Sequence, residues 1–226
     1  MKAHWLNRQN NKNLIVFFAG WSFDYNPFCN HPECGDNDLL MIYDYNNMDI
    51  PDELKTLNNY ESKILAAWSM GVFTAYLNSV LFEDFNKKIA VNGTITPVDD
   101  KFGIPVKIFE LTLKHAASGL GGKFYKNVFQ TFKEYEEYLK NPVQRSIENR
   151  VEELKNLYDL IRQQPADFDG EKFYDCAVVC QNDKIIPSAN QSASHNKNNV
   201  PVISLDCGHF PFYNFSKWDE IIELCR

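Results

Sequence analysis

Several features are absent from this chain. It has no apolar run approaching the roughly 18 residues that a membrane-spanning helix needs, so no transmembrane segment is predicted. Its first residues, 1–8, lack the apolar stretch of a secretory signal peptide. Lysine and arginine together number 23 against 30 acidic residues, and the net charge of -7 argues against a general nucleic-acid-binding surface. No internal repeat or low-complexity tract is visible. We therefore expect a globular protein of the cytoplasm that binds neither membranes nor nucleic acids.

A second set of cysteine or histidine ligands for a metal ion is also absent. The segment Cys29-Asn30-His31-Pro32-Glu33-Cys34 resembles half of a zinc site, but no other pair has matching spacing, and a structural zinc site needs four ligands. The chain holds six cysteines. Because no secretory signal is evident, we expect reduced thiols rather than disulfides. Cys176 and Cys180 are interpreted as small buried residues of one strand.

The hydrophobic content of 44% and the charged content of 23% are typical of a globular protein with one core. Short apolar runs without polar alternation are typical of strands that are buried on both faces of a parallel sheet. Such runs occur at 14–18, 39–43, 64–67, 89–91, 176–180 and 200–205. Helix-like stretches at 70–85, 187–197 and 216–225 separate several of them. This alternation predicts an α/β fold with a mostly parallel central sheet.

The alternation breaks between residues 94 and 168, where helical spacing of apolar residues dominates. We predict a helical cap insertion at 94–168 in a core built from 1–93 and 169–226. The front of this insertion is basic: residues 101–133 hold six lysines and a single acidic residue, Glu110. An ordinary solvated helix face explains such a run. A local basic patch that receives an acidic partner is the alternative.

The segment Ala67-Trp68-Ser69-Met70-Gly71 carries the strongest chemical signal. A strand-like run leads into it and a helix-like run follows. This is the context of the G-x-S-x-G nucleophile elbow of α/β-hydrolases, in which a serine hydroxyl is exposed on a sharp strand-to-helix turn. Alanine replaces the first glycine of that pattern, and it is the mildest replacement. We predict that Ser69 is a catalytic nucleophile.

A nucleophilic serine needs a histidine base and an acid, which follow it in this order of the chain: serine, acid, histidine. Asp183 stands just after the predicted strand 176–180, and His209 just after the predicted strand 200–205, in the segment Gly208-His209-Phe210-Pro211. Parallel α/β sheets collect functional groups at these strand ends. We assign the acid to Asp183. Asp206 lies too close to His209 in sequence, and Asp99 and Asp100 are further competitors.

In this assignment His209 takes the proton of Ser69 and later returns it to the leaving group. Asp183 holds the tautomer of His209 and stabilises its charged form. The negative oxygen of the tetrahedral intermediate needs backbone N–H donors. These are expected from Met70, which follows the nucleophile, and from Trp21, which follows an early strand. The mechanism requires neither a metal ion nor an organic cofactor.

Four segments also resemble a known family. They are Phe18-Ala19-Gly20-Trp21, Ala67-Trp68-Ser69-Met70-Gly71-Val72, the stretch Asn92-Gly93-Thr94-Ile95-Thr96-Pro97-Val98-Asp99-Asp100-Lys101-Phe102-Gly103-Ile104-Pro105, and Cys207-Gly208-His209-Phe210-Pro211-Phe212. The chain resembles the BioG-type pimeloyl-[acyl-carrier protein] methyl ester esterases. The resemblance implies an α/β-hydrolase of biotin synthesis that cleaves the methyl ester of pimeloyl-carrier protein. Ser69, Asp183 and His209 fall where the triad of that family is expected.

The resemblance also suggests a use for the basic part of the cap. Acyl-carrier proteins are acidic, so Lys123 and Lys126 are candidates for binding the carrier, and Trp21 is a candidate for lining the substrate pocket. Two other functions stay open at this level. One is a general short-acyl carboxylesterase or thioesterase, because the same triad cleaves oxygen and sulfur esters. The other is a non-catalytic binding protein with a hydrolase fold.

Overall fold

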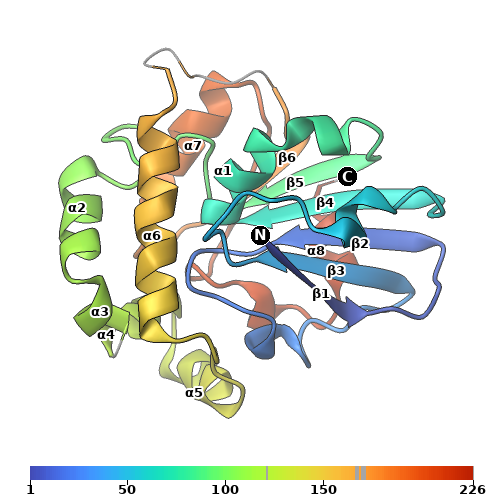
Figure 1. Cartoon of the computed structure of the whole chain (residues 1–226), viewed down its shortest axis with the longest axis horizontal. Coiled ribbons are helices and arrows are strands. Elements are labelled where there is room, and N and C mark those ends of the chain that lie inside the picture. Colours follow the sequence, from blue (N-terminus) through green and yellow to red (C-terminus); the bar gives the residue numbers. More distant parts are fainter. Residues whose placement is uncertain (121, 166–167, 169–171, 226) are drawn as a thin grey trace.

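The computed structural model describes residues 1–120, 122–165, 168 and 172–225. Within these ranges, seven strands form one sheet. Their spatial order is β1 (Lys2–Asn7), β3 (Asn37–Tyr43), β2 (Asn13–Phe18), β4 (Ser62–Trp68), β5 (Lys87–Val91), β6 (Cys176–Cys180) and β7 (Val202–Leu205). All neighbours pair in parallel except β1, which pairs antiparallel with β3. The prediction of an α/β fold with a mostly parallel sheet is confirmed (Figure 1).

Strand β1 was not predicted from the sequence. Its residues are exposed or half-buried at this edge of the sheet, whereas every residue of β3 is buried. An edge strand that is covered on one side lacks the continuous apolar run by which the inner strands were identified. The other predicted strands are present, with bounds shifted by up to two residues.

Helix α1 (Met70–Leu77) follows β4 and is shorter than the predicted stretch 70–85. It ends at Asn78, whose side-chain Nδ2 donates to the carbonyl of Thr74 at 2.8 Å. The chain continues as a 3-10 turn, η3 (Ser79–Phe82). Helices α7 (Ser188–Lys197) and α8 (Trp218–Glu223) lie within the ranges predicted for them.

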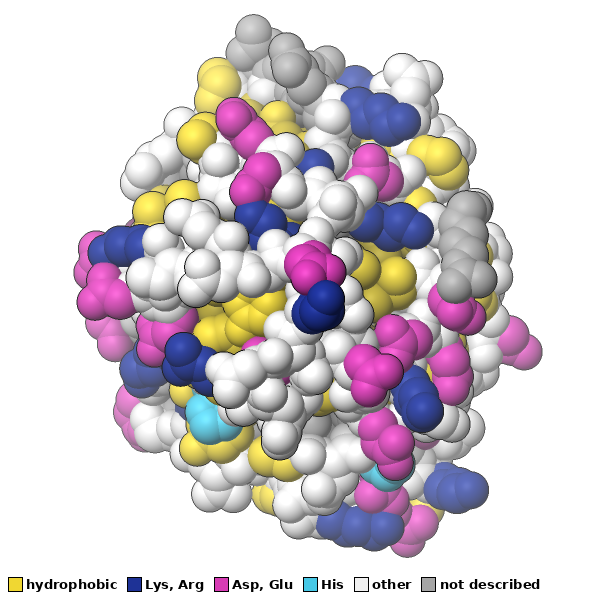
Figure 2. Space-filling view, turned by 90° about the vertical axis from the view of Figure 1, so that its right-hand side faces the viewer, with side chains coloured by type: hydrophobic (Ala, Val, Ile, Leu, Met, Phe, Trp, Pro, Cys, Tyr) yellow, Lys and Arg dark blue, Asp and Glu magenta, His cyan; other side chains and the backbone are white. Residues whose placement is uncertain are grey.

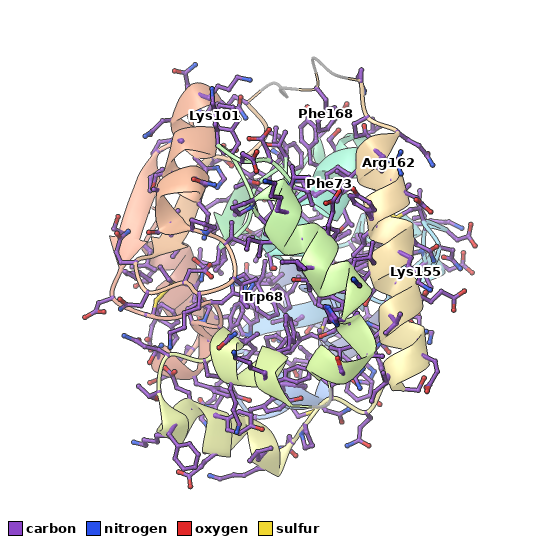
Figure 3. The ribbon with its side chains drawn as sticks, turned by 90° about the vertical axis from the view of Figure 1, so that its left-hand side faces the viewer. Trp68, Phe73, Lys101, Lys155, Arg162 and Phe168 are labelled. Carbon is purple, nitrogen blue, oxygen red and sulfur yellow. A yellow bond between two sulfur atoms is a disulfide. The ribbon has the colours of Figure 1, made fainter. Side chains whose placement is uncertain are left out.

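Among the described residues between β5 and β6, five helices are present. They are α2 (Val106–Lys114), α3 (Ala116–Leu120), α4 (Lys123–Val128), α5 (Phe132–Lys140) and α6 (Ile147–Arg162). They gather at one end of the sheet, at the left of Figure 1, and lie in front of it when that end faces the viewer in Figure 3. Residues 94–168 are therefore mostly helical. The division into core and cap stays a prediction, because its second boundary adjoins residue 169, outside the described residues.

The cap helices share their packing with the sheet domain. Phe23, in the loop after β2, makes ring contacts with Trp68 and Phe210 of the core and with Tyr125 and Tyr138 of the cap. All five rings are buried. Burial of apolar surface is the main stabilising term in folding. The cap is therefore held to the sheet by one continuous aromatic core.

Two pairs of cysteines are joined, and the expectation of reduced thiols is wrong for these four residues. Cys176 of β6 is bonded to Cys225 near the C-terminal helix, and Cys180, at the end of β6, is bonded to Cys207 after β7. Cys29 and Cys34 are free thiols. Sequence spacing did not reveal these pairs because β6 and β7 become neighbours only when the sheet is assembled.

The face turned away from the cap shows basic and acidic side chains mixed with one another (Figure 2). No area of a single sign dominates this view. Among the described helices, none combines the length and apolar character needed to cross a membrane.

Candidate active site

Ser69 lies at the junction between β4 and α1 with a backbone φ of 56° and ψ of -125°. A positive φ is strained for a residue with a side chain, and such strain is typical of a nucleophile elbow. The elbow also requires close approach of backbones. A Cβ on Gly71 would lie 2.3 Å from the carbonyl oxygen of Phe18. Ala67 is fully buried in β4, two residues before Ser69, and its methyl group is accommodated in the core.

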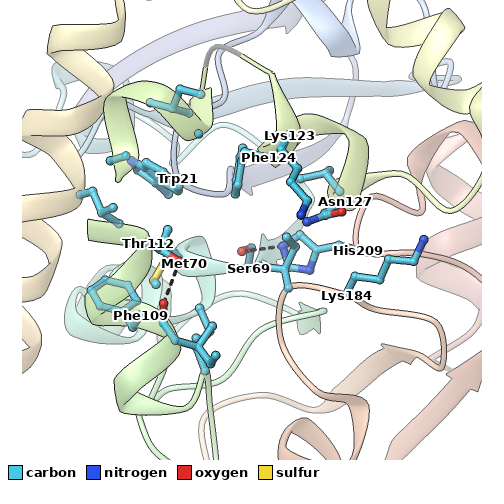
Figure 4. Close-up of a pocket in the computed structure, with 18 of the residues that line it drawn as sticks. Trp21, Ser69, Met70, Phe109, Thr112, Lys123, Phe124, Asn127, Lys184 and His209 are labelled. Atoms are coloured by element: carbon cyan, nitrogen blue, oxygen red, sulfur yellow. Dashed lines mark hydrogen bonds between the residues drawn. The ribbon is translucent and has the colours of Figure 1, made fainter. Parts of the chain in front are cut away.

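His209 connects Ser69 and Asp183 in one chain of hydrogen bonds. Its Nε2 lies 2.9 Å from Ser69 Oγ, and its Nδ1 lies 2.7 Å from Asp183 Oδ2. An ionised carboxylate only accepts, so Nδ1–H donates to Asp183 and Nε2 is left to accept the serine proton. Figure 4 shows the serine–histidine contact at the wall of a pocket. This is the arrangement in which a histidine activates a serine nucleophile.

The competing acids are engaged elsewhere. Asp206 accepts from the side chain of Asn182 at 2.6 Å. Asp99 accepts from the N–H groups of Lys101 and Phe102, and Asp100 accepts from the N–H of Val106. Asp99 and Asp100 stabilise their own loop, and Asp206 connects the loops after β6 and β7. Asp183 is the carboxylate that the structure brings to His209.

Two backbone N–H groups and one side chain fix the carboxylate of Asp183. Its Oδ1 accepts from Ile185 and Ile186 at 2.7 and 2.9 Å, and its Oδ2 accepts from Gln191 Nε2 at 2.8 Å. Gln191 is fully buried on α7 and was not identified from sequence. A lone glutamine on a polar helix carries no signal of such a role until α7 is packed under the loop.

Asn92, at the end of β5, joins the loops that carry Asp183 and His209. Its Nδ2 donates to the carbonyls of Gly208 and His209, and its Oδ1 accepts from the N–H of Cys180 at 2.7 Å. Trp68 Nε1 also donates to the His209 carbonyl at 2.8 Å. From the sequence, Asn92 was noted only as the first residue of the stretch 92–105 that resembles the esterase family. Its place directly after a strand was a usable signal for a functional position.

The loop after β2 lies against the nucleophile. A Cβ on Gly20 would lie 3.0 Å from Ser69 Cβ and 3.0 Å from the ring of Trp68. Among the described residues, the N–H groups of Trp21 and Met70 have no hydrogen-bond partner. Two unpaired donors beside a nucleophile are what an oxyanion hole requires. Their assignment to an oxyanion hole stays a prediction.

Residues of the cap hold this loop. The buried carboxylate of Glu153, on α6, accepts from Ser22 N at 3.0 Å and from Tyr45 N at 2.8 Å. Arg145 Nη1 lies 2.9 Å from the same carboxylate, and its Nη2 lies 3.0 Å from Asp44. Burial raises the pKa of Glu153, and the Arg145 guanidinium opposes that rise. Neither Glu153 nor Arg145 was identified from sequence, because charged residues on a helix ordinarily face solvent.

A mainly apolar cavity of about 250 Å³ opens beside Ser69 and His209 (Figure 4). Trp21 and Phe124 line one side, and Lys123, Asn127 and Lys184 lie on the side of His209. The rest of the lining comes from the core and from α2, α3, α4 and α6: Phe23, Trp68, Met70, Ile104, Ile108, Phe109, Thr112, His115, Ala116, Gly119, Leu120, Val128, Leu154 and Ile185. A slender acyl chain suits such a lining, with its ester at the serine.

The two lysines proposed to bind a partner differ in position. Lys123 lines the cavity, and Lys126 is exposed on α4 outside it. Ile108 and Leu111 of α2 are also exposed, so the cap presents both apolar and basic side chains to solvent. Within the described part of the chain, no group of three or more His, Cys, Asp or Glu side chains is arranged to hold a metal ion.

Comparison with known proteins gives a consistent picture. A family model described as "Pimeloyl-ACP methyl esterase BioG" matches residues 1–221. A crystal structure of BioG from Haemophilus influenzae superposes with a TM-score of 0.83 at 29% identity, covering 97% of this chain and 99% of that one. The type II thioesterase BorB superposes with a TM-score of 0.61 at 13% identity, covering 99% and 97% of the chains. These similarities confirm the α/β-hydrolase fold.

One curated relative is longer than this chain. It is a malonyl-[acyl-carrier protein] O-methyltransferase of Bacteroides fragilis, 33% identical over 204 residues. The match covers 88% of this chain and 40% of that protein. The chain therefore spans less than half the length of this relative, and the name of the relative describes the whole of the longer protein.

Proposed function

Because the chain belongs to the pimeloyl-ACP methyl esterase family BioG, we propose that it is a serine esterase acting on the methyl ester of pimeloyl-[acyl-carrier protein] in biotin synthesis. The observation that carries this proposal is the hydrogen-bonded chain from Ser69 through His209 to Asp183 at the wall of an apolar cavity. It matches the residue order and roles of a serine hydrolase.

In the proposed reaction, Ser69 Oγ attacks the ester carbonyl while His209 Nε2 takes the serine proton. The carbonyl oxygen becomes an anion, which the N–H groups of Trp21 and Met70 stabilise. Collapse of this intermediate breaks the bond to the methoxy group, which takes the proton from His209 and leaves as methanol. Water then attacks the acyl-enzyme in the same way, and the free carboxylate of the pimeloyl group is released.

The carrier protein is proposed as part of the substrate on two grounds. Lys123 and Lys184 stand at the cavity and Lys126 is exposed nearby, which provides positive charge for an acidic carrier or its phosphate linker. The name of the Bacteroides fragilis relative describes methylation of an acyl group on a carrier protein. An esterase that hydrolyses the methyl ester of a carrier-bound acyl chain would remove the group that such a methylation adds.

The test is to incubate the protein with methyl pimeloyl-[acyl-carrier protein] and to follow methanol release and the mass of the carrier. The Ser69→Ala variant is the control. We expect the wild type to remove one methyl group, and Ser69→Ala to lose at least about 10⁴-fold in rate. Hydrolysis of simple esters without cleavage of the carrier-bound ester would reject the substrate and favour a general esterase. Cleavage of neither substrate would reject the enzyme assignment.

A further inference from the structure

Glu153 stands at the centre of the contacts between the cap and the loop Ala19–Ser22. Its Oε2 accepts from the N–H of Ser22 and its Oε1 accepts from the N–H of Tyr45. The side chain has no exposed surface. A buried carboxylate is costly unless its oxygens are fully paired, and here three donors pair it, the third being Arg145. Such an arrangement fixes the positions of the groups that donate to it.

The second of these donors extends the effect to the other end of the loop. The hydroxyl of Tyr45 donates to the carbonyl of Ala19 at 2.7 Å. Glu153 therefore holds Ser22 directly and Ala19 through Tyr45. Between these two held residues lie Gly20, whose backbone approaches Ser69, and Trp21, whose N–H has no partner among the described residues.

Further cap contacts act on the same loop. The indole Nε1 of Trp21 donates to the carbonyl of Arg150 on α6 at 2.7 Å. The hydroxyl of Ser22 lies 3.0 Å from the hydroxyl of Tyr125 on α4, which also accepts from Arg150 Nη1 at 2.7 Å. The sheet supplies the contact at Ala19, and the cap supplies those at Trp21 and Ser22.

We propose that Glu153 is a positioning residue of the esterase, which sets the Trp21 N–H toward the oxyanion by holding the loop Ala19–Ser22 from the cap. This inference rests on the proposed function and adds to it a residue outside the triad. Glu153 does not touch the substrate or the reacting atoms. Its effect is expected in the transition state, where negative charge develops on the carbonyl oxygen, and not in ground-state binding.

The test compares the kinetics of p-nitrophenyl butyrate hydrolysis by Glu153→Gln and by the wild type. The assay temperature is well below the thermal unfolding midpoint of either protein. Glutamine keeps the shape but offers one oxygen and one NH₂ group to sites occupied by three donors, so the loop loses at least one contact. Loss of a whole oxyanion donor typically costs 10²–10³ in kcat, and displacement of a retained donor should cost less, about 30-fold. KM should change by no more than about twofold, since ground-state contacts are kept.

Two further measurements separate positioning from general structural damage. Affinity for a trifluoromethyl ketone, which forms a tetrahedral anion on Ser69, should fall in parallel with kcat/KM. Asn156→Ala is the matched control: it removes a bond of 2.9 Å from α6 to the carbonyl of Asn46 and touches none of the three donors to Glu153. That variant should keep wild-type kcat. Glu153→Asp, which keeps the charge on a shorter side chain, should recover part of the lost kcat.

Unchanged kcat and unchanged trifluoromethyl ketone affinity in a folded Glu153→Gln variant would overturn the inference, even if its unfolding midpoint fell. Equal losses in Asn156→Ala would overturn it as well, because any loosening of α6 would then suffice. Failure of the proposed function appears differently. If the wild type hydrolyses the butyrate ester but not the carrier-bound ester, the substrate proposal fails and the comparison of variants still decides the role of Glu153. If the wild type hydrolyses neither ester, both proposals fail.

Discussion

The candidate active site has two halves: a triad half, which comprises the loops of Asp183 and His209, and an oxyanion half, which is the loop Ala19–Ser22. These halves are supported in different ways. The loops that carry Asp183 and His209 are joined by the amide of Asn92 and by the disulfide between Cys180 and Cys207, and Gln191 of α7 fixes the Asp183 loop. The loop Ala19–Ser22 is instead held by a buried ionic group on the cap, with Glu153 and Arg145 at its centre.

This difference has a consequence for the mechanism. A neutral amide network and a disulfide in the core hold the base and the acid. The cap reaches the histidine loop through a bond of 3.1 Å from the N–H of Phe210 to the carbonyl of Val128. An ionic network on α6 and the segment before it holds the loop of the oxyanion donor, so displacement of α6 should weaken transition-state stabilisation more than it disturbs the triad. Variants that affect one half at a time can test this separation.

The largest effect is expected from Asn92→Ala, which breaks the support of the triad half and leaves the cap intact. The substitution leaves the Cys180 N–H and the Gly208 carbonyl without a side-chain partner, whereas the His209 carbonyl keeps its bond from Trp68. Unpaired buried polar groups cost about 1–3 kcal/mol each, so we expect a loss of about 3 kcal/mol in the free energy of unfolding. Denaturant titration measures this loss.

The same variant should lower kcat by about 100-fold, because the histidine and its acid lose their common anchor. Asn92→Asp serves as a control: it keeps the acceptor for Cys180 N and removes the donors to the histidine loop. It should fall between the wild type and Asn92→Ala. Unchanged kcat in Asn92→Ala would show that the disulfide and Gln191 hold these loops without Asn92.

A second effect concerns His195 of α7, which supports the triad half through a bond of 2.8 Å from its Nε2 to the carbonyl of Gly93. Burial lowers the pKa of His195 from 6.5 to about 4. Because the unfolded chain then binds the proton more readily, stability is unaffected above about pH 6.5 and falls as the pH drops from 6.5 to 4. The shift of the pKa corresponds to about 3 kcal/mol over this window.

His195→Gln should remove this contribution, whatever its own cost in stability. Denaturant titrations of both proteins between about pH 7.5 and pH 4.5 should show a shallower fall for the variant. Parallel curves for the two proteins would contradict the prediction. Stability is the better readout here, because activity at low pH also reflects His209.

The sequence indicates that Ser69, Asp183 and His209 lie close together, but it does not indicate which residues support the loop Ala19–Ser22, and the reason is physical. Ser69 directly follows a strand, and Asp183 and His209 come within four residues of the end of one, so their positions in the chain indicate that they lie at one edge of the sheet. Glu153 and Arg145 lie far along the chain, on and before a cap helix, and only tertiary packing brings them to Ser22. From the sequence alone, two charged residues in and just before a helix are expected to face solvent.

The same reasoning explains the errors in the fold. The inner strands are continuous apolar runs because both of their faces are covered, and these were identified. Strand β1 is half-exposed, lacks such a run and was not predicted. The pairing of Cys180 with Cys207 depends on the parallel alignment of β6 and β7, which spacing in the sequence does not encode.

A third effect separates binding of the carrier protein by the cap from the support that the cap gives to the loop Ala19–Ser22. Lys123→Glu combined with Lys126→Glu reverses the charge of one side chain at the cavity and of one outside it, without removing a hydrogen bond to the loop Ala19–Ser22. We expect KM for the carrier-bound ester to rise by about tenfold at low salt, while kcat and the KM for p-nitrophenyl butyrate stay unchanged. Steady-state kinetics on both substrates measures this.

The matched control reverses the same amount of charge elsewhere. Lys12 and Lys55 are exposed on the core, away from the cap. A variant with Lys12→Glu and Lys55→Glu should leave the KM for the carrier-bound ester near its wild-type value. An equal rise in both double variants would assign the effect to net charge, and the docking proposal would fail.

The smallest effect is expected from Ser22→Ala, which removes the hydroxyl contact to Tyr125 but keeps the N–H bond to Glu153. Tyr125 retains its bond from Arg150, so one neutral hydrogen bond is lost, at a cost of about 1 kcal/mol in the free energy of unfolding. Because the backbone contact still holds the loop, kcat should fall by no more than about threefold. Steady-state assays with p-nitrophenyl butyrate measure the kcat of this variant and of Glu153→Gln side by side. If Ser22→Ala lowered kcat more than Glu153→Gln, the hydroxyl rather than the carboxylate would set the loop, and the support of the oxyanion half would have to be reassigned to Tyr125.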